Sequence, residues 1–288
     1  MKDKSKLYKI FVYVALITLA ISIIVPIAWV FLASVKENVE FYGDPWALPK
    51  GFYVQNFIDA FNKANMGEYM LNSVIVTVTA LIILIAVALP ASYVLARFDF
   101  KGKKILNTLF MMGLFINSNY IVVPIFLMLL DGDKALTSMI GHGFLIDNIF
   151  VLALVYAATS LPFTIYLMSN YFKTLSTSYE EAAYIDGAGH FKTLFTVMAP
   201  LAKPSIVTVI LFNFLSFWNE YIIALTLLPG DSKTLPVGLI NLMAGQKAAA
   251  NYGQLYAGLV IVMIPTLILY ILVQKQLTQG MTVGGTKD

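Results

Sequence analysis

The sequence predicts an all-α integral membrane protein with six transmembrane helices. Of its 288 residues, 59% are hydrophobic and only 12% are charged, whereas a soluble domain carries about 25% charged residues. A helix that crosses the roughly 30 Å of bilayer hydrocarbon needs about 20 mainly apolar residues. Six stretches meet this requirement, and they cover residues 10–33, 71–96, 105–130, 147–167, 206–228 and 255–273. The sequence contains no internal repeat or linker, so we expect one domain over residues 1–288.

The spans contain features that a soluble helix would not tolerate in its interior. Five of them hold an internal proline, at Pro26, Pro90, Pro124, Pro162 and Pro265. In a helix bundle, neighbouring groups satisfy the backbone carbonyls that a proline leaves free. The first span follows several lysines, as a secretion signal does, but it is longer than the about 7–15 apolar residues of a cleaved signal core. We therefore interpret it as a retained membrane anchor.

Lysine and arginine residues in the loops predict the orientation of the chain. With the N-terminus in the cytoplasm, the inner segments hold about two thirds of the 19 Lys and Arg residues, as the positive-inside rule requires. We therefore expect both termini, and the loop at 173–203, on the cytoplasmic side. The loops at 34–70, 131–146 and 229–254 then face outward, and they are too polar to span.

The composition also excludes several classes of function. The absence of cysteine excludes disulfides, thiolate metal sites and cysteine nucleophiles, and two histidines argue against a multi-histidine metal centre. The net charge of +3 is too small to indicate nucleic acid as a partner. The nearest approach to a P-loop runs from Gly187 to Thr193, but Phe191 occupies the second required glycine position. We therefore expect this chain to bind no nucleotide or other cofactor.

The loop at 173–203 has the pattern of two short helices. Ser178 followed three residues later by Glu181 predicts a capping box. The first helix then covers about two turns, and Gly187 lies where a left-handed residue would end it. A helix of about eight residues is marginal by itself in water, so we expect it to pack against a partner.

The second half of this loop continues toward the fifth span. A second short helix is expected over residues 191–198, and Pro200 is expected to end it. Pro204 suits the first turn of the span that follows.

These residues resemble the EAA loop of permease subunits in binding-protein-dependent ABC importers. Glu181-Ala182-Ala183, Gly187 and the proline of Ala199-Pro200 stand at the spacing of that motif, although Val197 and Ala199 replace its usual isoleucine and leucine. Further segments resemble the carbohydrate-uptake branch of the family: Leu71-Asn72-Ser73, Ala96-Arg97-Phe98, Leu161-Pro162-Phe163, Tyr184-Ile185-Asp186-Gly187-Ala188, Phe217-Trp218-Asn219-Glu220 and Thr234-Leu235-Pro236-Val237-Gly238.

The resemblance implies the type I ABC importer permease fold in a bacterial cell membrane, with the EAA loop as the helix that couples to a cytoplasmic ATPase. The residues that it assigns to coupling are Glu181, Ala182, Ala183, Gly187 and Pro200. It implies a second homologous permease, two ABC ATPase subunits that hold ATP and Mg, an extracytoplasmic sugar-binding protein, and membrane lipid around the spans. The substrate would be a sugar, with an oligosaccharide favoured, and the chain itself would not be an enzyme.

Polar residues inside the spans are candidates for the substrate path, because such residues usually face a bundle interior or a water-filled cavity. The candidates are Asn117, Asn119 and Tyr120 in the third span, Tyr156, Thr159 and Ser160 in the fourth, and Asn213, Ser216, Phe217 and Glu220 in the fifth. The alternative is that these groups bond one helix to another, as polar residues in membranes often do. For Glu220, an external gate is a further alternative.

Two other classes of function compete with the importer. An ion-coupled secondary carrier, acting without an ATPase, usually needs several ionisable groups inside the membrane or helix breaks in matched halves. Glu220 is the clear carboxylate within the spans, which argues against such a carrier. A membrane enzyme would need a cluster of nucleophile, base and orienting group, and the sequence offers none.

Overall fold

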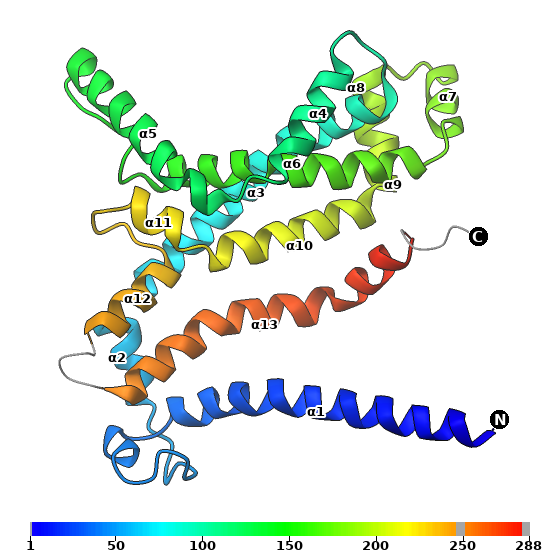
Figure 1. Cartoon of the computed structure of the whole chain (residues 1–288). Helices are drawn as coiled ribbons and strands as arrows, with labels where there is room; N and C mark the ends of the chain where they lie inside the picture. The colour runs from blue at the N-terminus through cyan, green and yellow to red at the C-terminus, as the bar shows by residue number, and fades with distance from the viewer. Residues whose placement is uncertain (1, 246–250, 284–288) are drawn as a thin grey trace. The chain divides into compact units, whose positions relative to one another are not determined.

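The computed structural model describes residues 2–245 and 251–283, and its regular elements over these residues are helices (Figure 1). Four helices are long and apolar enough to cross a membrane, or up to six if each of two bent helix pairs counts as one span. The prediction of an all-α membrane protein is therefore confirmed. The helices are α1 (Lys2–Ser34), η1 (Asn38–Phe41), α2 (Gln55–Lys63), α3 (Met66–Arg97), α4 (Lys103–Gly113), α5 (Ser118–Ile140), α6 (Ile149–Thr174), α7 (Ser178–Ile185), α8 (His190–Thr193), η2 (Leu194–Met198), α9 (Ala199–Leu201), α10 (Lys203–Asn219), α11 (Ile222–Leu227), α12 (Leu235–Gly245) and α13 (Tyr252–Val283).

The chain forms two compact units. The first comprises Met1–Gly67 and Gly238–Pro265, and the second comprises Glu68–Val237 and Thr266–Asp288. The expectation of one domain over residues 1–288 stays a prediction.

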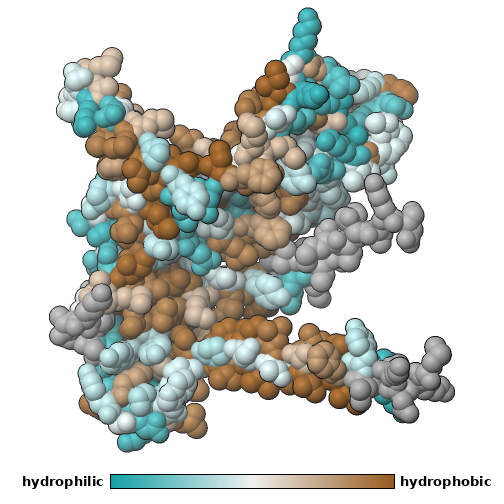
Figure 2. Space-filling model, viewed as in Figure 1, coloured by the Kyte–Doolittle hydropathy of each residue, from teal (hydrophilic) through white to brown (hydrophobic). Residues whose placement is uncertain are grey.

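In the first unit, α1 is apolar on every face from residue 10 onward, after the charged residues of its first turns. Figure 2 shows hydrophobic side chains along its length, and nearly all of them are exposed. A helix that is apolar on every face needs a hydrophobic environment on every face. The exposed surface of α1 is therefore suited to lipid.

The segment after α1 is held together by a buried lysine. Lys36 is fully buried, its Nζ donates to the Pro45 carbonyl at 2.8 Å, and it lies 4.5 Å from the centre of the Trp29 ring. This combination of hydrogen bond and cation–π contact compensates the ammonium group for the loss of water. Nearby, the Lys50 and Glu37 backbone N–H groups donate to the Glu40 carboxylate and hold its pKa below the ordinary value.

The core of the second unit is built around α6, which contacts α4, α10 and α11. The Met168 and Phe172 side chains of α6 are completely buried. Small residues let the helices approach closely, since Ala80 and Ala88 of α3 and Ala153 of α6 are also fully buried. This core fixes the ends of the helices that carry the candidate site.

Two expected spans are interrupted. The span predicted at 105–130 consists of α4 and α5, which are bent by 106°. Asn117 causes this break because its backbone is extended and its side chain accepts the Asn119 N–H at 2.9 Å, which starts a new helix. The span predicted at 206–228 ends as α10 at Asn219 and resumes as α11 at Ile222. An extended residue, Glu220, lies between these two helices.

Candidate functional site

The short helix α7 has one docked face and one free face. Glu180 and Ala183 are buried, whereas Glu181, Ala182 and Ile185 are exposed. The prediction that such a short helix needs a partner is met in part within this chain, through the buried face. The exposed face remains available for another molecule.

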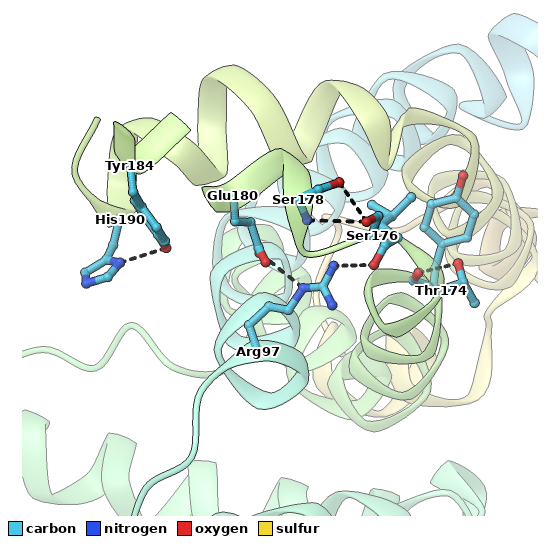
Figure 3. A network of polar contacts seen from close by, with 9 residues as sticks. Arg97, Thr174, Ser176, Ser178, Glu180, Tyr184 and His190 are labelled. Carbon is cyan, nitrogen blue, oxygen red and sulfur yellow. Dashed lines mark hydrogen bonds and ion pairs between the residues drawn. The ribbon is translucent and has the colours of Figure 1, made fainter. Parts of the chain in front are cut away.

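The predicted capping box does not form. The helix begins at Ser178 after Thr177, whose side chain makes no cap, and Ser178 Oγ instead lies 2.8 Å from Ser176 Oγ (Figure 3). The capping prediction is therefore wrong, because the neighbouring serine competes for the Ser178 hydroxyl. No residue that the structure describes bonds to the Glu181 carboxylate, so its charge is directed to solvent.

The predicted end of α7 at Gly187 is confirmed. Gly187 has φ +79°, its N–H donates to the Tyr184 carbonyl at 3.0 Å, and the Ala188 N–H donates to the Ala183 carbonyl at 2.9 Å. These two bonds are the Schellman motif, in which a left-handed residue closes the last turn of a helix. Glycine adopts this conformation without the steric cost of a Cβ.

The second half of the loop is helical, as expected, but Pro200 does not end it. Residues 194–198 form a π-helical turn, and α9 carries Pro200 in its first turn, so the chain reaches Ala202 before it bends into α10. Proline lacks the N–H that would bond four residues back, and the wider π turn precedes the position where this bond is missing. Pro204 lies in the first turn of α10, as predicted.

The buried face of α7 is joined to the last residue of α3. Arg97 Nε lies 3.1 Å from Glu180 Oε1, and Arg97 Nη2 donates to the Leu175 carbonyl at 2.7 Å (Figure 3). Sequence reasoning missed Glu180 and assigned no role to Arg97 beyond the resemblance. The sequence did contain a signal for this contact. Arg97 is the single arginine of the sequence, and the planar guanidinium group of arginine favours buried ion pairs with several hydrogen bonds.

A second polar cluster lies at the break between α10 and α11. The Tyr156 hydroxyl donates to Glu220 Oε2 at 2.6 Å, and the Ile223 and Ala224 N–H groups donate to the same carboxylate at 2.8 and 3.1 Å. The Phe217 and Tyr156 rings stack with centroids 5.3 Å apart. The structure thus brings three of the path candidates together, with Glu220 as the cap of α11.

The remaining path candidates are separated into buried and exposed groups. Asn213 is buried and donates to Thr164 Oγ1 at 3.0 Å, which matches the alternative of a helix-to-helix bond. Ser216 is exposed on α10. Asn117, Asn119 and Tyr120 are exposed at the start of α5.

The fourth-span candidate Thr159 bonds within its own helix, to the Val155 and Tyr156 carbonyls. Its neighbour Ser160 is partly exposed. Over residues 2–245 and 251–283, no group of three or more His, Cys, Asp or Glu side chains could hold a metal ion.

Replacing Asn213 with alanine is expected to lower stability by about 1 kcal/mol or less, because an interhelical polar contact in a membrane contributes about 0.6 kcal/mol on average. Thermal unfolding in detergent measures this loss. Thr164→Val is expected to cause a similar loss, and the double variant less than the sum, since both changes remove one bond. A raised KM for the transported solute with unchanged stability would instead place Asn213 on the substrate path.

Two further segments that resembled the sugar branch lie against each other. The Ser73 hydroxyl accepts the Leu235 N–H at 2.7 Å, and the Asn72 amide donates to the Lys233 carbonyl at 3.1 Å. Residues near the start of α3 therefore fix the start of α12, which lies in a loop where no helix was predicted.

The fold and the docked helix define a multi-spanning helical membrane protein in which the short helix α7 has one buried and one exposed face. Residues 88–283 match the family described as the binding-protein-dependent transport system inner membrane component, and the chain belongs to this family. This membership favours the importer over the ion-coupled carrier and places the chain in a membrane as a transporter subunit, which is not a class of enzyme.

Relatives and a solved structure agree with this family. The chain is 34% identical over 270 residues to the diacetylchitobiose uptake system permease protein NgcG of Streptomyces coelicolor. These aligned residues cover 93% of this chain and 86% of that protein. It is 28% identical over 291 residues to the trehalose/maltose transport system permease protein MalG of Thermococcus litoralis, with 98% of each chain covered. A chain of a bacterial ABC transporter involved in the import of the acidic polysaccharide alginate matches with a TM-score of 0.76 and 26% identity, over 94% of this chain and 96% of that chain.

Proposed function

We propose that this chain is a permease subunit of an ATP-driven sugar importer, in which it forms half of the translocation pathway beside a second homologous permease. Two ABC ATPase subunits on the cytoplasmic side would hold ATP and Mg, and an extracytoplasmic binding protein would deliver the sugar. The names of the relatives refer to diacetylchitobiose and to trehalose and maltose, and the solved neighbour is a chain of a transporter involved in the import of alginate. All four of these carbohydrates contain more than one sugar unit, which supports an oligosaccharide as the substrate.

The free face of α7 is the observation that carries this proposal. Glu181 is exposed without a partner among the described residues, and Ala182 beside it has a short side chain. A cleft in an ATPase subunit could approach the backbone closely at Ala182, while a basic residue of that cleft pairs with Glu181. The Schellman turn at Gly187 keeps the helix short enough to enter such a cleft.

The exposure of the side chains reduces the number of candidates for the substrate path, because a side chain must be accessible to bind a sugar. Of the candidates, Asn117, Asn119, Tyr120 and Ser216 are exposed. We propose these four as the sugar-contacting set, with hydroxyl and amide groups for hydrogen bonds and one aromatic ring for stacking. The buried side chains of Asn213 and Phe217 would support the path from behind.

Affinity purification in mild detergent, followed by mass spectrometry, tests the proposed partners. We expect a P-loop ATPase and a second permease to be recovered with the chain. Glu181→Lys is expected to reduce recovery of the ATPase by about tenfold or more, since it reverses a charge at the contact. Glu68→Lys is the matched control, because Glu68 is also exposed but lies in the first turn of α3.

The competing function gives a different result. If the chain were recovered alone and moved solute into liposomes without ATP, the importer would be wrong. The ion-coupled carrier would then take its place, with Glu220 as the group to test for coupling.

A further inference from the structure

The last turn of α3 contacts the loop around α7 through both polar and aromatic groups. Arg97 binds Glu180 of α7 and also the Leu175 carbonyl, in the segment that leads into α7. The next residue, Phe98, contacts the ring of His190 edge-on, with centroids 5.2 Å apart. The Ala96-Arg97-Phe98 segment therefore contacts residues on both sides of α7, although it lies about 80 residues earlier in the sequence.

The contact between Arg97 and Glu180 is shielded from water. Their side chains are only 11% and 8% exposed. Removing one partner of a buried ion pair leaves the other charge without compensation, so the pair resists opening. The guanidinium plane also binds in two directions at once, which fixes its orientation relative to Glu180 and Leu175.

An aromatic contact supports the same connection. His190 Nδ1 lies 3.0 Å from the Tyr184 hydroxyl, and the two rings meet edge-on (Figure 3). Because Phe98 follows the last residue of α3 and contacts His190, α3 is linked to the C-terminal end of α7 as well as to its first turn. Tyr184 and His190 are exposed, whereas the side chains of the ion pair are largely buried, so the ion pair is the firmer of the two contacts.

The peptide chain alone would transmit a force on α7 to only two of the long helices. It joins the N-terminal end of α7 to α6, and the C-terminal end through α8, η2 and α9 to α10. The helix α3 has no such covalent route. The Arg97–Glu180 pair supplies a direct one.

We infer that Arg97 is a positioning residue that holds α3 to α7, so that displacement of α7 by a partner moves α3 together with it. This inference rests on the proposed function, because the partner that displaces α7 is taken to be an ATPase. Loss of the pair would then leave the ATPase bound but would separate ATP hydrolysis from solute movement. Loss of Glu181, which is exposed, would instead weaken ATPase binding.

The first experiment measures coupling in the complete importer reconstituted in liposomes. Arg97→Gln and Glu180→Gln are expected to retain the ATPase on purification, while the amount of sugar moved per ATP hydrolysed falls by about tenfold. The charge-exchanged double variant, Arg97→Glu with Glu180→Arg, is expected to restore part of this ratio, because the ion pair forms again but the bond to the Leu175 carbonyl is lost. Glu181→Gln is the matched comparison, because it is adjacent to Glu180 and is expected to lower ATPase recovery.

A second measurement does not depend on transport. The sequence has no cysteine, so one spin label can be attached at Val94→Cys on α3 and another at Ile185→Cys on α7, both of which are exposed positions. In the otherwise unchanged chain, the distance between the labels is expected to have one narrow distribution. With Arg97→Gln, the distribution is expected to broaden. Arg97→Lys keeps the charge but cannot bond to Glu180 and the Leu175 carbonyl through a planar guanidinium, so it is expected to give an intermediate width. It replaces Arg97→Gln in this experiment if Arg97→Gln does not accumulate.

The outcomes separate this inference from the proposed function. Normal coupling in Arg97→Gln, together with an unchanged label distance, would overturn the role of Arg97 even if the ATPase is recovered. A low ratio that the charge-exchanged variant does not raise, with an unchanged label distance, would also overturn it. If no ATPase is recovered with the unmodified chain, the proposed function fails. The label distances in the isolated chain would then still decide whether Arg97 holds α7 to α3.

Discussion

Replacing Gly187 with tryptophan is expected to leave the chain inserted in the membrane and to abolish ATP-driven uptake. Gly187 has φ +79°, a conformation that costs a residue with a Cβ about 1–2 kcal/mol. No atom lies within 4 Å of a Cβ added there, so the first carbon of the new side chain meets open space. The indole would instead project from the exposed end of α7, where a partner must approach. Membrane content by immunoblot and uptake of labelled sugar measure the two effects.

Smaller substitutions separate backbone strain from bulk. Gly187→Ala is expected to reduce uptake in part, because it adds backbone strain without a bulky side chain. Gly187→Asn is expected to reduce uptake less, because asparagine tolerates the left-handed region. Gly189→Ala is the matched control, since Gly189 has φ −76° and also has open space around it. It is expected to transport normally. Full uptake by Gly187→Trp would contradict the assignment of α7 to coupling.

Glu220→Ala is expected to impair transport far more than it impairs assembly. The carboxylate accepts the Tyr156 hydroxyl and two N–H groups at the start of α11, so alanine leaves three donors unpaired at the break after α10. A hydrogen bond to a charged group contributes about 1.5–3 kcal/mol, so transport is expected to fall by about tenfold or more. Uptake kinetics measure this loss, and recovery of the second permease measures assembly.

The neighbours of Glu220 supply the controls. Tyr156→Phe keeps the ring stacked on Phe217 but removes one donor, so its effect is expected to be smaller than that of Glu220→Ala. Asn219→Ala is the matched surface change, because Asn219 is exposed and its amide donates to the Leu215 carbonyl of its own helix. Unchanged uptake kinetics in Glu220→Ala would reassign Glu220 to packing.

The helix breaks show where sequence reasoning was incomplete. Residues 105–130 and 206–228 are apolar enough to read as continuous spans, and hydropathy averages over many residues. In each stretch, one side chain interrupts the helix. Asn117 caps the start of α5, and Glu220 caps the start of α11. Such a cap competes with helix continuation by only about 1 kcal/mol, which a hydropathy average does not register.

The all-α membrane class, the Gly187 turn and the family pattern of the 173–203 loop follow from the sequence alone. They depend on local properties, since hydrophobic length and the tolerance of glycine for positive φ need no distant partner. The roles of the two adjacent glutamates depend on tertiary structure. Both belong to one short helix, but Arg97, brought from 83 residues earlier, selects Glu180 for the buried face and leaves Glu181 exposed. A charge can be buried only beside its partner, and the tertiary fold alone determines where that partner lies.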